Sequence, residues 1–348
     1  MQDAAAKGPI RVALVGLGSF AQTAHLPALS SHPDLRLVAI CDPDPATQRR
    51  LATNVRYPLP AFFDSSGGLL DWGAFDVAGV CTPNDTHLGL AEALVEARKH
   101  VLVEKPLEGS RDRLRALRDS AMLQCVSVRI NHSLRLHAAA RQLARYVWAV
   151  DSPVTSLHLN FTHGGPETVG LRASWYRSES RSLGGVVADL GSHLFDLCSY
   201  LSGGQWATAV RWRGSKDLLG STVGFESELS LSRGGGAHVR GSWSHRGGVR
   251  ANALIIMDKL VARAEFLPSP AFVVFDRRGG NGSPLRISIS WSQDRAYKSL
   301  AHEYWALGRG LPGALPGIRS AEHYSAIRRA MRRSVSGEWR QVDRVQLS

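Results

Sequence analysis

A chain of 348 residues is long enough for two domains of ordinary size, and its apolar share of 44% is normal for a globular protein. No stretch approaches the roughly 18 consecutive apolar residues of a membrane span, and the first residues lack the apolar core of a secretion signal. The four cysteines lie far apart without a CxxC pair, which argues against a disulfide framework or a cysteine-based metal site. We therefore expect a cytoplasmic protein without membrane contacts.

The net charge of +12 lies entirely in the second part of the chain, because basic and acidic residues balance over residues 1–130. A solvated basic surface is the simpler explanation of this excess. The alternative is an anionic substrate, such as a phosphorylated or nucleotide-linked compound. No recognisable nucleic-acid module accompanies the charge, so a nucleic-acid partner is not expected.

Strands and helices alternate along the first part of the chain. Apolar runs that end in Gly, Pro or polar residues predict strands, and apolar residues three or four positions apart predict helices. The predicted strands cover residues 10–18, 35–43, 76–83, 100–106 and 125–132, and the predicted helices cover 19–32, 45–54, 86–99 and 110–123. This alternation is typical of βαβ units, so we expect an α/β Rossmann domain with a parallel sheet over residues 8–130.

Residues 131–348 follow a different pattern, in which strand-like runs dominate and Gly-rich turns separate them. These runs cover residues 154–163, 208–214, 224–233, 236–246, 252–266, 271–279 and 285–291. The pattern predicts an α+β domain with a large, mainly antiparallel open sheet. A helix near residues 320–335 is also predicted, and we expect it to pack on the first domain.

The first predicted strand runs into "VGLGSFA", a glycine turn that opens a helix. The first glycine permits the tight turn, the second permits close approach of a pyrophosphate, and a small third residue lets the helix pack close to the strand. The helix N-terminus then offers free N–H groups to phosphate. The predicted cofactor contacts of this turn are Gly16, Gly18, Ser19, Phe20 and Ala21.

Asp42 lies at the end of the second predicted strand, about 20 residues beyond the glycine turn. A carboxylate at that place binds the ribose hydroxyls of the adenosine half of a dinucleotide, and it repels a 2′-phosphate. Pro43 supplies no positive charge to offset that repulsion. We therefore favour NAD over NADP as the cofactor, with a simple Asp-Pro turn as the alternative.

Three blocks of the sequence carry a resemblance to a known family. They are "VGLGSFAQTAHLPAL" from residue 15, "DVAGVCTPNDTHLGLAEALVEARKHVLVEKPL" from residue 76 and "GGVVADLGSHLFDLCSYLSGG" from residue 184. Together they resemble the Gfo/Idh/MocA oxidoreductases, named for glucose–fructose oxidoreductase, inositol dehydrogenase and a rhizopine-catabolism protein. The departures are mild. Ala21 replaces the commoner third glycine, and Leu136 and His137 replace an aromatic residue and a proline that many members carry.

The resemblance implies a role for "EKP" at residues 104–106. In the family the lysine of this motif lies at the carboxyl edge of the sheet, between nicotinamide and substrate, and the peptide bond before the proline is often cis. Matched here, Lys105 would hydrogen-bond the reacting oxygen and assist proton transfer. Glu104 would pair with Lys105 or contact the nicotinamide ribose. Ligands of open α/β sheets bind beyond the carboxyl ends of strands, which agrees independently.

The third block places Asp189, His193 and Asp196 at helical spacing on one face. A carboxylate and an imidazole one turn apart can hold a hydroxyl and take its proton. By resemblance to the sugar and inositol dehydrogenases, Asp189 binds the substrate and His193 is the catalytic acid–base group. Asp196 is either a structural cap or a weak candidate for the substrate site, where it would support the other two.

Weaker candidates complete the predicted site. By family match, Thr82, Asn84 and His87 lie along the cofactor, whereas His25 is read as structural. Arg135, Tyr176 and Arg177 are candidates for the substrate cleft, with loop surface as the alternative. The sequence holds no HExxH or comparable histidine pairing, so hydride transfer without a metal is the expected chemistry.

These features together predict an NAD(P)-dependent dehydrogenase or ketoreductase. Its substrate would be a secondary alcohol or ketone of a sugar, aminosugar, nucleotide sugar or inositol. The alternative is a regulatory or sensor protein of the same fold that binds the cofactor without turnover. Family members commonly pair through the flat faces of their open sheets, so the resemblance also implies a homodimer or homotetramer in which residues 131–348 bind substrate and form the contacts between copies.

Overall fold

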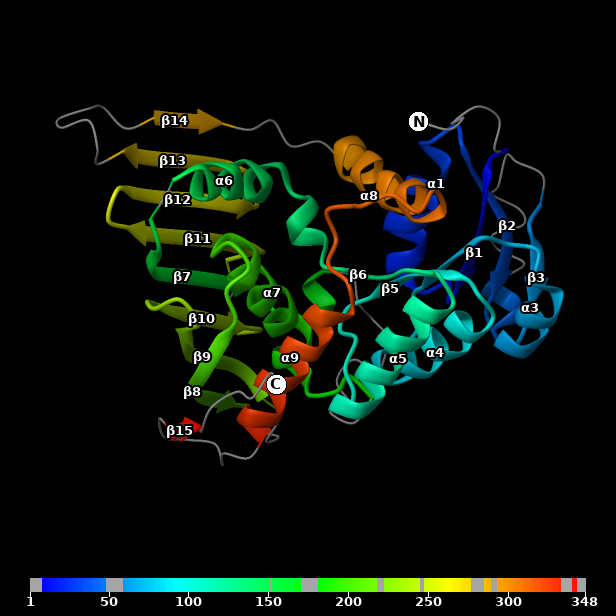
Figure 1. The fold of residues 1–348 in the computed structure, drawn as a ribbon, viewed down its shortest axis with the longest axis horizontal. Helices are drawn as coiled ribbons and strands as arrows, with labels where there is room; N and C mark the ends of the chain where they lie inside the picture. Colours follow the sequence, from blue (N-terminus) through cyan, green and yellow to red (C-terminus); the bar gives the residue numbers. More distant parts are fainter. Residues whose placement is uncertain are drawn as a thin grey trace. The chain divides into compact units, whose positions relative to one another are not determined.

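The computed structural model describes residues 8–47, 59–150, 152–169, 181–217, 222–244, 247–276, 285–288, 293–332 and 340–342 (Figure 1). The chain divides into two compact units. The first unit comprises Met1–Leu107, Asp112–Asn131 and Gln293–Ile318, and the second comprises Glu108–Arg111, His132–Ser292 and Arg319–Ser348. None of the described helices is both long and apolar enough to cross a membrane.

The sheet of the first unit contains six strands among the described residues, and all of its pairings are parallel. Their order across the sheet is β3 (Ala61–Phe63), β2 (Leu35–Cys41), β1 (Ile10–Val15), β4 (Val77–Val80), β5 (His100–Glu104) and β6 (Val128–Asn131). The central strands are buried along almost their whole length, which explains their continuous apolar runs. The predicted α/β Rossmann architecture is confirmed.

Helices cover both faces of this sheet. They are α1 (Leu26–Ser30), α3 (Ser66–Trp72), α4 (His87–Glu96), α5 (Arg111–Leu123) and α8 (Gln293–Gly308). Figure 1 shows α1 and α8 on one face and α4 and α5 on the other. Most of the helix predicted at 45–54 lies outside the described residues.

Helix α8 belongs to the first unit although it comes late in the chain. Its side chain Tyr304 is fully buried and reaches β4 at Gly79. A Cβ atom at Gly79 would collide with the Tyr304 hydroxyl and lie 2.6 Å from Leu14 Cδ2. The absence of a side chain at Gly79 therefore makes room for α8 against the middle of the sheet.

The second unit contains a nine-stranded sheet within the described residues. The strand order is β14 (Leu285–Ser288), β13 (Ala271–Asp276), β12 (Leu260–Leu267), β11 (Arg250–Met257), β7 (Val154–Thr162), β10 (Gly236–Ser242), β9 (Thr222–Leu231), β8 (Ala207–Lys216) and β15 (Arg340–Val342). Only the β7–β10 pair among these described strands is parallel, so the predicted mainly antiparallel sheet is confirmed. The apolar run at 252–266 divides between β11 and β12.

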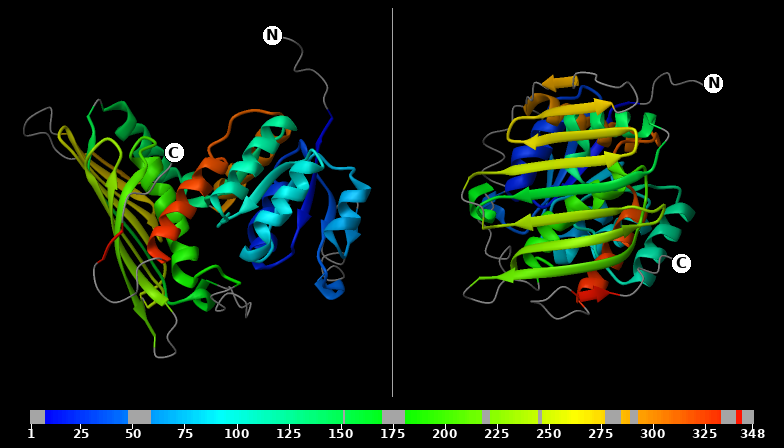
Figure 2. Two further views of the ribbon diagram at one scale, coloured as in Figure 1. Left: turned by 60° about the horizontal axis from the view of Figure 1, so that its bottom comes forward. Right: turned by 90° about the vertical axis from the view of Figure 1, so that its left-hand side faces the viewer.

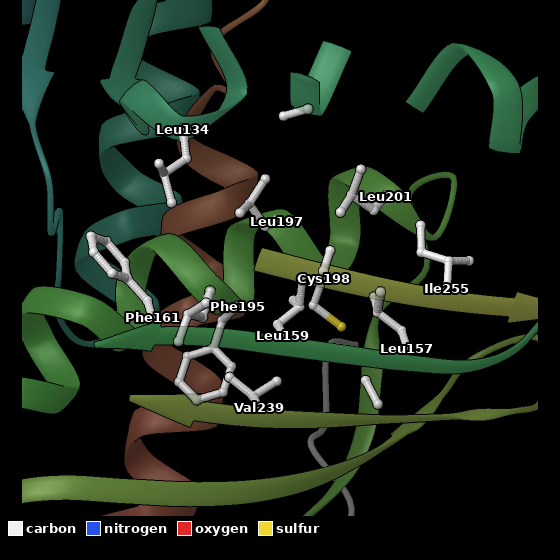
Figure 3. Packing of buried hydrophobic residues seen from close by; sticks show 14 of the residues in the cluster. Leu134, Leu157, Leu159, Phe161, Phe195, Leu197, Cys198, Leu201, Val239 and Ile255 are labelled. Atoms are coloured by element: carbon white, nitrogen blue, oxygen red, sulfur yellow. The ribbon is translucent and has the colours of Figure 1, made fainter. Parts of the chain in front are cut away.

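One face of this sheet packs against α6 (Ala138–Ala149) and α7 (Ser192–Leu201), and α9 (Ile318–Arg332) joins the same core. Strand β7 shows the reason, because Leu157, Leu159 and Phe161 alternate along it and are buried. They meet apolar side chains of α7 such as Phe195 and Cys198 (Figure 3). The right-hand view of Figure 2 shows none of the described helices on the opposite face of the sheet.

Candidate active site

The glycine turn after β1 has the backbone geometry that its sequence predicts. Gly16 has a φ of +90°, and a Cβ atom there would lie 2.7 Å from the carbonyl oxygen of Cys81. Gly18 is exposed, and a Cβ atom there would meet nothing closer than 3.9 Å. Ala21 is fully buried, and it begins the π-helical turn Ala21–His25 that leads into α1. The turn thus presents an open backbone at a helix start, which suits the pyrophosphate of a dinucleotide.

Gly18 is followed by Ser19 and Phe20, and these two side chains are also exposed at the turn. Asp42 follows β2 and reaches the same turn, since its Oδ2 accepts a hydrogen bond from the backbone N–H of Leu17 at 2.7 Å. Its Oδ1 accepts one from the N–H of Asp44 at 2.9 Å. A carboxylate at the end of the second strand is the group that recognises ribose hydroxyls in dinucleotide-binding folds.

The segment after β4 holds Thr82, Asn84 and His87. The hydroxyls of Thr82 and Thr86 lie 2.6 Å apart, and Asn84 is buried. The His87 ring is buried too, and its nitrogens lie 2.9 Å from the carbonyl of Pro106 and 2.8 Å from that of Thr82. Burial lowers the pKa of His87 despite these carbonyls. This ring therefore ties the loop after β4 to the loop after β5.

Strand β5 ends at Glu104, so Lys105 follows at the carboxyl edge of the parallel sheet. The Lys105–Pro106 peptide bond is cis. The Glu104 carboxylate is buried, and its Oε1 lies 2.5 Å from Asn131 Nδ2 and 2.8 Å from His25 Nε2. From the sequence, Glu104 is expected to contact Lys105 or the nicotinamide ribose, and His25 is expected to be structural. In the structure the two residues contact each other directly.

In the second unit, Asp189 lies in the π-helical turn Val187–Gly191, which runs directly into α7. Asp189 is buried, with 6% of the residue exposed, and its Oδ2 accepts a hydrogen bond from Trp243 Nε1 at 3.1 Å. His163 Nε2 lies 3.6 Å from the same oxygen. Turns of this wide type interrupt α-helices at functional sites more often than elsewhere.

His193 lies on the first turn of α7 and is 8% exposed. Its ring packs against two others, with centroid distances of 6.0 Å to His132 and 6.0 Å to Phe161. The ring of Phe161 also lies 6.1 Å from that of His163, so Asp189 and His193 share a buried region lined by histidine and aromatic rings within the second unit.

Sequence reasoning missed His163 and Trp243. His163 follows β7, and its Nδ1 accepts a hydrogen bond from the N–H of Gly165 at 3.0 Å. The proton of the neutral ring is therefore on Nε2, the nitrogen that faces Asp189. The only available signal was a histidine directly after an apolar strand, in "FTHGG".

Arg135 and Asp196, both substrate candidates, are paired with each other. Arg135 Nε lies 2.6 Å from Asp196 Oδ2, and its Nη2 lies 2.7 Å from Oδ1. Ser320 donates a further hydrogen bond to Oδ1 at 2.9 Å, and the guanidinium carbon lies 4.8 Å from the centroid of the Tyr200 ring. Burial alone would raise the pKa of Asp196, but Arg135 and His132 outweigh it and hold the pKa below its usual range.

The Arg135–Asp196 pair holds the 3-10 turn Ser133–Leu136 against α7, and Ser320 connects α9 to the same carboxylate. These contacts favour a supporting role over direct substrate contact. Tyr176 and Arg177 lie outside the described residues. Within the part of the chain that the structure describes, no three His, Cys, Asp or Glu side chains gather as metal ligands.

A parallel sheet with a glycine turn after its first strand and a carboxylate after its second defines a dinucleotide-binding unit. A family model described as "Oxidoreductase family, NAD-binding Rossmann fold" matches residues 10–132, and the GFO/IDH/MocA C-terminal domain matches residues 153–259. The chain belongs to the Gfo/Idh/MocA oxidoreductase family. The predicted family is confirmed, and so is NAD as the cofactor of the first unit.

Curated relatives agree with this assignment. The chain is 27% identical over 205 residues to D-glucoside 3-dehydrogenase of Escherichia coli. The matched region covers 58% of this chain and 57% of that protein. It is 33% identical over 107 residues to inositol 2-dehydrogenase of Rhizobium meliloti, which covers 31% of each. The matches span 57%, 29% and 56% of the first three curated relatives, so they do not extend over those whole proteins.

Solved structures share the fold over nearly the whole chain. GenD2 from gentamicin A biosynthesis, crystallised with NAD, has a TM-score of 0.81 at 21% identity and 97% coverage of both chains. An inositol dehydrogenase homolog from Azotobacter vinelandii, complexed with NAD+, has a TM-score of 0.80 at 19% identity and the same coverage. At such identities the likeness concerns the fold.

Proposed function

We propose that the protein is an NAD-dependent dehydrogenase or ketoreductase acting on a secondary alcohol or ketone of a sugar, aminosugar, nucleotide sugar or inositol. The observation that carries this proposal is the buried pair Asp189 and His193, with Asp189 held by Trp243. Relatives named as glucoside, galactose and inositol dehydrogenases support the substrate class.

The cofactor would be held by the turn Gly16–Ala21 and by Asp42. The exposed backbone of the turn suits the phosphates, and the Asp42 carboxylate suits the ribose hydroxyls and disfavours a 2′-phosphate. When bound, the nicotinamide supplies the acceptor or donor of a hydride. Thr82 and Asn84 lie in the loop after the neighbouring strand, where they would line the same ligand.

The protein's own groups would handle the proton. In the oxidising direction the carbinol carbon gives up a hydride, its hydroxyl gives up a proton, and a ketone, NADH and a proton result. His193 would take that proton, since an imidazole can accept and return one near neutral pH. Lys105 would hydrogen-bond the reacting oxygen, and Asp189 would hold a substrate hydroxyl.

His163 and Trp243 would support Asp189. Trp243 Nε1 donates a hydrogen bond to Asp189 Oδ2 at 3.1 Å, and His163 Nε2 lies 3.6 Å from the same oxygen. The hydrogen bond from Trp243 fixes the direction of the carboxylate. A fixed acceptor selects the orientation of a polyol, in which many hydroxyls are chemically alike.

Assembly into a homodimer or homotetramer is also part of this proposal. The uncovered face of the second sheet carries Leu254, Ile256 and Val261, which are partly exposed, and Phe275, which is 44% exposed. Light scattering tests this directly. A particle of 37.8 kDa at every concentration would contradict assembly.

A turnover screen tests the proposed activity. Purified protein is incubated with NAD+ or NADP+ and a panel of sugars, aminosugars, nucleotide sugars and inositols, and absorbance at the reduced-nicotinamide band is followed. We expect turnover with at least one class, and NAD+ is expected to be preferred. Binding of NADH, seen as a change in its fluorescence, without turnover of any panel member would instead favour a regulatory protein.

A further inference from the structure

A buried chain of hydrogen bonds connects α8 to the end of β5 within the first unit. The Tyr304 hydroxyl lies 2.6 Å from His25 Nδ1, and His25 Nε2 lies 2.8 Å from Glu104 Oε1. Asn131 Nδ2 lies 2.5 Å from the same Glu104 oxygen. Tyr304 and His25 are fully buried, and Asn131 and Glu104 nearly so.

The direction of each hydrogen bond in this chain follows from chemistry. Burial raises the pKa of Tyr304 well above its ordinary value, so the phenol stays protonated. Its O–H donates a hydrogen bond to His25 Nδ1. An imidazole that accepts at Nδ1 carries its proton on Nε2, and this N–H then donates to Glu104. The amide of Asn131 can only donate through Nδ2. Glu104 Oε1 therefore receives two N–H donors.

The chain joins the two parts of the first unit that serve the cofactor. His25 ends the π-helical turn that begins at Ala21, directly after the glycine turn. Glu104 ends β5 and is the residue before Lys105. Tyr304 comes from α8, 200 positions after Glu104 in the sequence, and it fits only because Gly79 has no side chain. Burying polar side chains together is costly unless they hydrogen-bond to one another, so such a network restricts its members to one arrangement.

We propose that Tyr304 and His25 are positioning residues for the reaction: together they fix the Glu104 carboxylate and thereby the orientation of the strand end that carries Lys105. This inference rests on the proposed role of Lys105. A reacting group displaced by about 1 Å can lose on the order of 10²-fold in rate, so loss of the chain reduces turnover without removing any group that touches the substrate.

The test compares Tyr304→Phe with Tyr297→Phe. Both remove one phenolic hydroxyl from α8, but Tyr297 is partly exposed on that helix. We expect Tyr304→Phe to lower kcat about tenfold and to shift the pH profile of kcat, with NADH affinity almost unchanged. Tyr297→Phe should behave as wild type. His25→Gln keeps an N–H donor and should retain more activity than His25→Leu. If Tyr304→Phe is too unstable to assay, this comparison of the two His25 variants tests the positioning role instead.

A second readout needs no substrate. Brief labelling with acetic anhydride, followed by mass spectrometry, measures the rate at which Lys105 reacts, and exposed Lys298 on α8 serves as the internal reference. We expect the rate at Lys105 to rise in Tyr304→Phe, because the strand end is released, and to stay unchanged in Tyr297→Phe. A purely structural role of Tyr304 would lower the melting temperature and leave the labelling ratio as in wild type.

The outcomes separate this inference from the proposed function. If Lys105→Ala abolishes turnover while Tyr304→Phe matches Tyr297→Phe in kcat, pH profile and labelling, the positioning role is wrong and the dehydrogenase proposal stands. If wild type turns over nothing in the panel, the proposed function fails, and the labelling ratio alone decides whether Tyr304 positions Lys105. An unchanged ratio then overturns the inference as well.

Discussion

The Asp42 carboxylate accepts a hydrogen bond from the backbone N–H of Leu17 at 2.7 Å, which places the second strand's terminal carboxylate on the glycine turn itself. The residue expected to recognise ribose therefore also stabilises the turn expected to hold the phosphates. A change at Asp42 acts on both, and a substitution that keeps an acceptor separates the two effects.

Asp42→Ala should weaken NADH binding by on the order of tenfold or more, since hydrogen bonds to a charged group contribute about 1.5–3 kcal/mol. Asp42→Asn keeps an oxygen for the Leu17 N–H and removes the charge, so it should narrow the preference against NADPH with less damage to the turn. Fluorescence titrations with NADH and NADPH measure both effects. A strong preference of wild type for NADPH would refute this reading of the carboxylate.

Asp189→Ala should raise KM and lower kcat together, because the carboxylate is proposed to hold a substrate hydroxyl in both the ground state and the transition state. Trp243→Phe removes one donor to that carboxylate and should shift both parameters in the same direction by less. Trp148→Phe is the matched control, since Trp148 is 53% exposed and donates to the carbonyl of Tyr200. Steady-state kinetics with the best substrate of the panel decide the point. Unchanged KM and kcat in Asp189→Ala would remove it from the site.

Asp196→Ala should act mainly on stability. It breaks a buried ion pair and leaves Arg135 without its bidentate partner, a change that typically costs about 3–5 kcal/mol. Arg263→Ala breaks the exposed pair with Glu265 in the same unit and should cost only about 0–1 kcal/mol. Urea unfolding compares the two variants. Equal stability of both, with activity lost only in Asp196→Ala, would return Asp196 to the substrate site.

Acid should destabilise the second unit in two stages. Burial lowers the pKa of His323 from 6.5 to about 4, and its Nε2 accepts a hydrogen bond from the N–H of Ala207 at 3.0 Å. As the pH falls, His323 is therefore protonated in the unfolded chain before it is protonated in the folded protein. Between pH 6.5 and about 4 this difference removes roughly 3 kcal/mol from the free energy of unfolding. The pKa of Asp196 is lower in the folded protein than in the unfolded chain. Its ionised form therefore stabilises the fold at pH values above the unfolded-state pKa, and this stability is lost at still lower pH.

His323→Gln keeps an acceptor for Ala207 and removes the titrating group. Its free energy of unfolding should therefore vary less than that of wild type between pH 6.5 and 4. Urea titrations at several pH values measure the difference. Equal pH dependence of the two proteins in that window would show that His323 does not titrate as proposed.

Much of the fold could be predicted from local sequence, because buried parallel strands and glycine turns leave strong patterns. Gly16, Asp42 and the Glu104–Lys105 strand end all lie at the carboxyl edge of the first sheet, as their positions after apolar runs indicated. The antiparallel sheet was likewise visible in alternating runs such as β7.

The contacts of the site were less predictable, because they join distant segments. Tyr304 meets His25 across 279 positions, and no local pattern in α8 indicates a buried hydroxyl. Arg135 and Asp196 each read as a polar residue near the site, and only the tertiary structure pairs them. The π-helical turn at Asp189 also escaped prediction, since a regular helix gives the same residue spacing.

The central claim is that Lys105 takes part in the reaction, and the kcat of Lys105→Ala tests it most directly. NADH affinity is measured on the same preparation to show that the first unit is folded. We expect kcat to fall by on the order of 10²–10⁴, the usual range for a positioned acid–base group, with NADH affinity almost unchanged. Turnover close to that of wild type would contradict the account and leave Glu104, Lys105 and Pro106 as a strand end without a catalytic role.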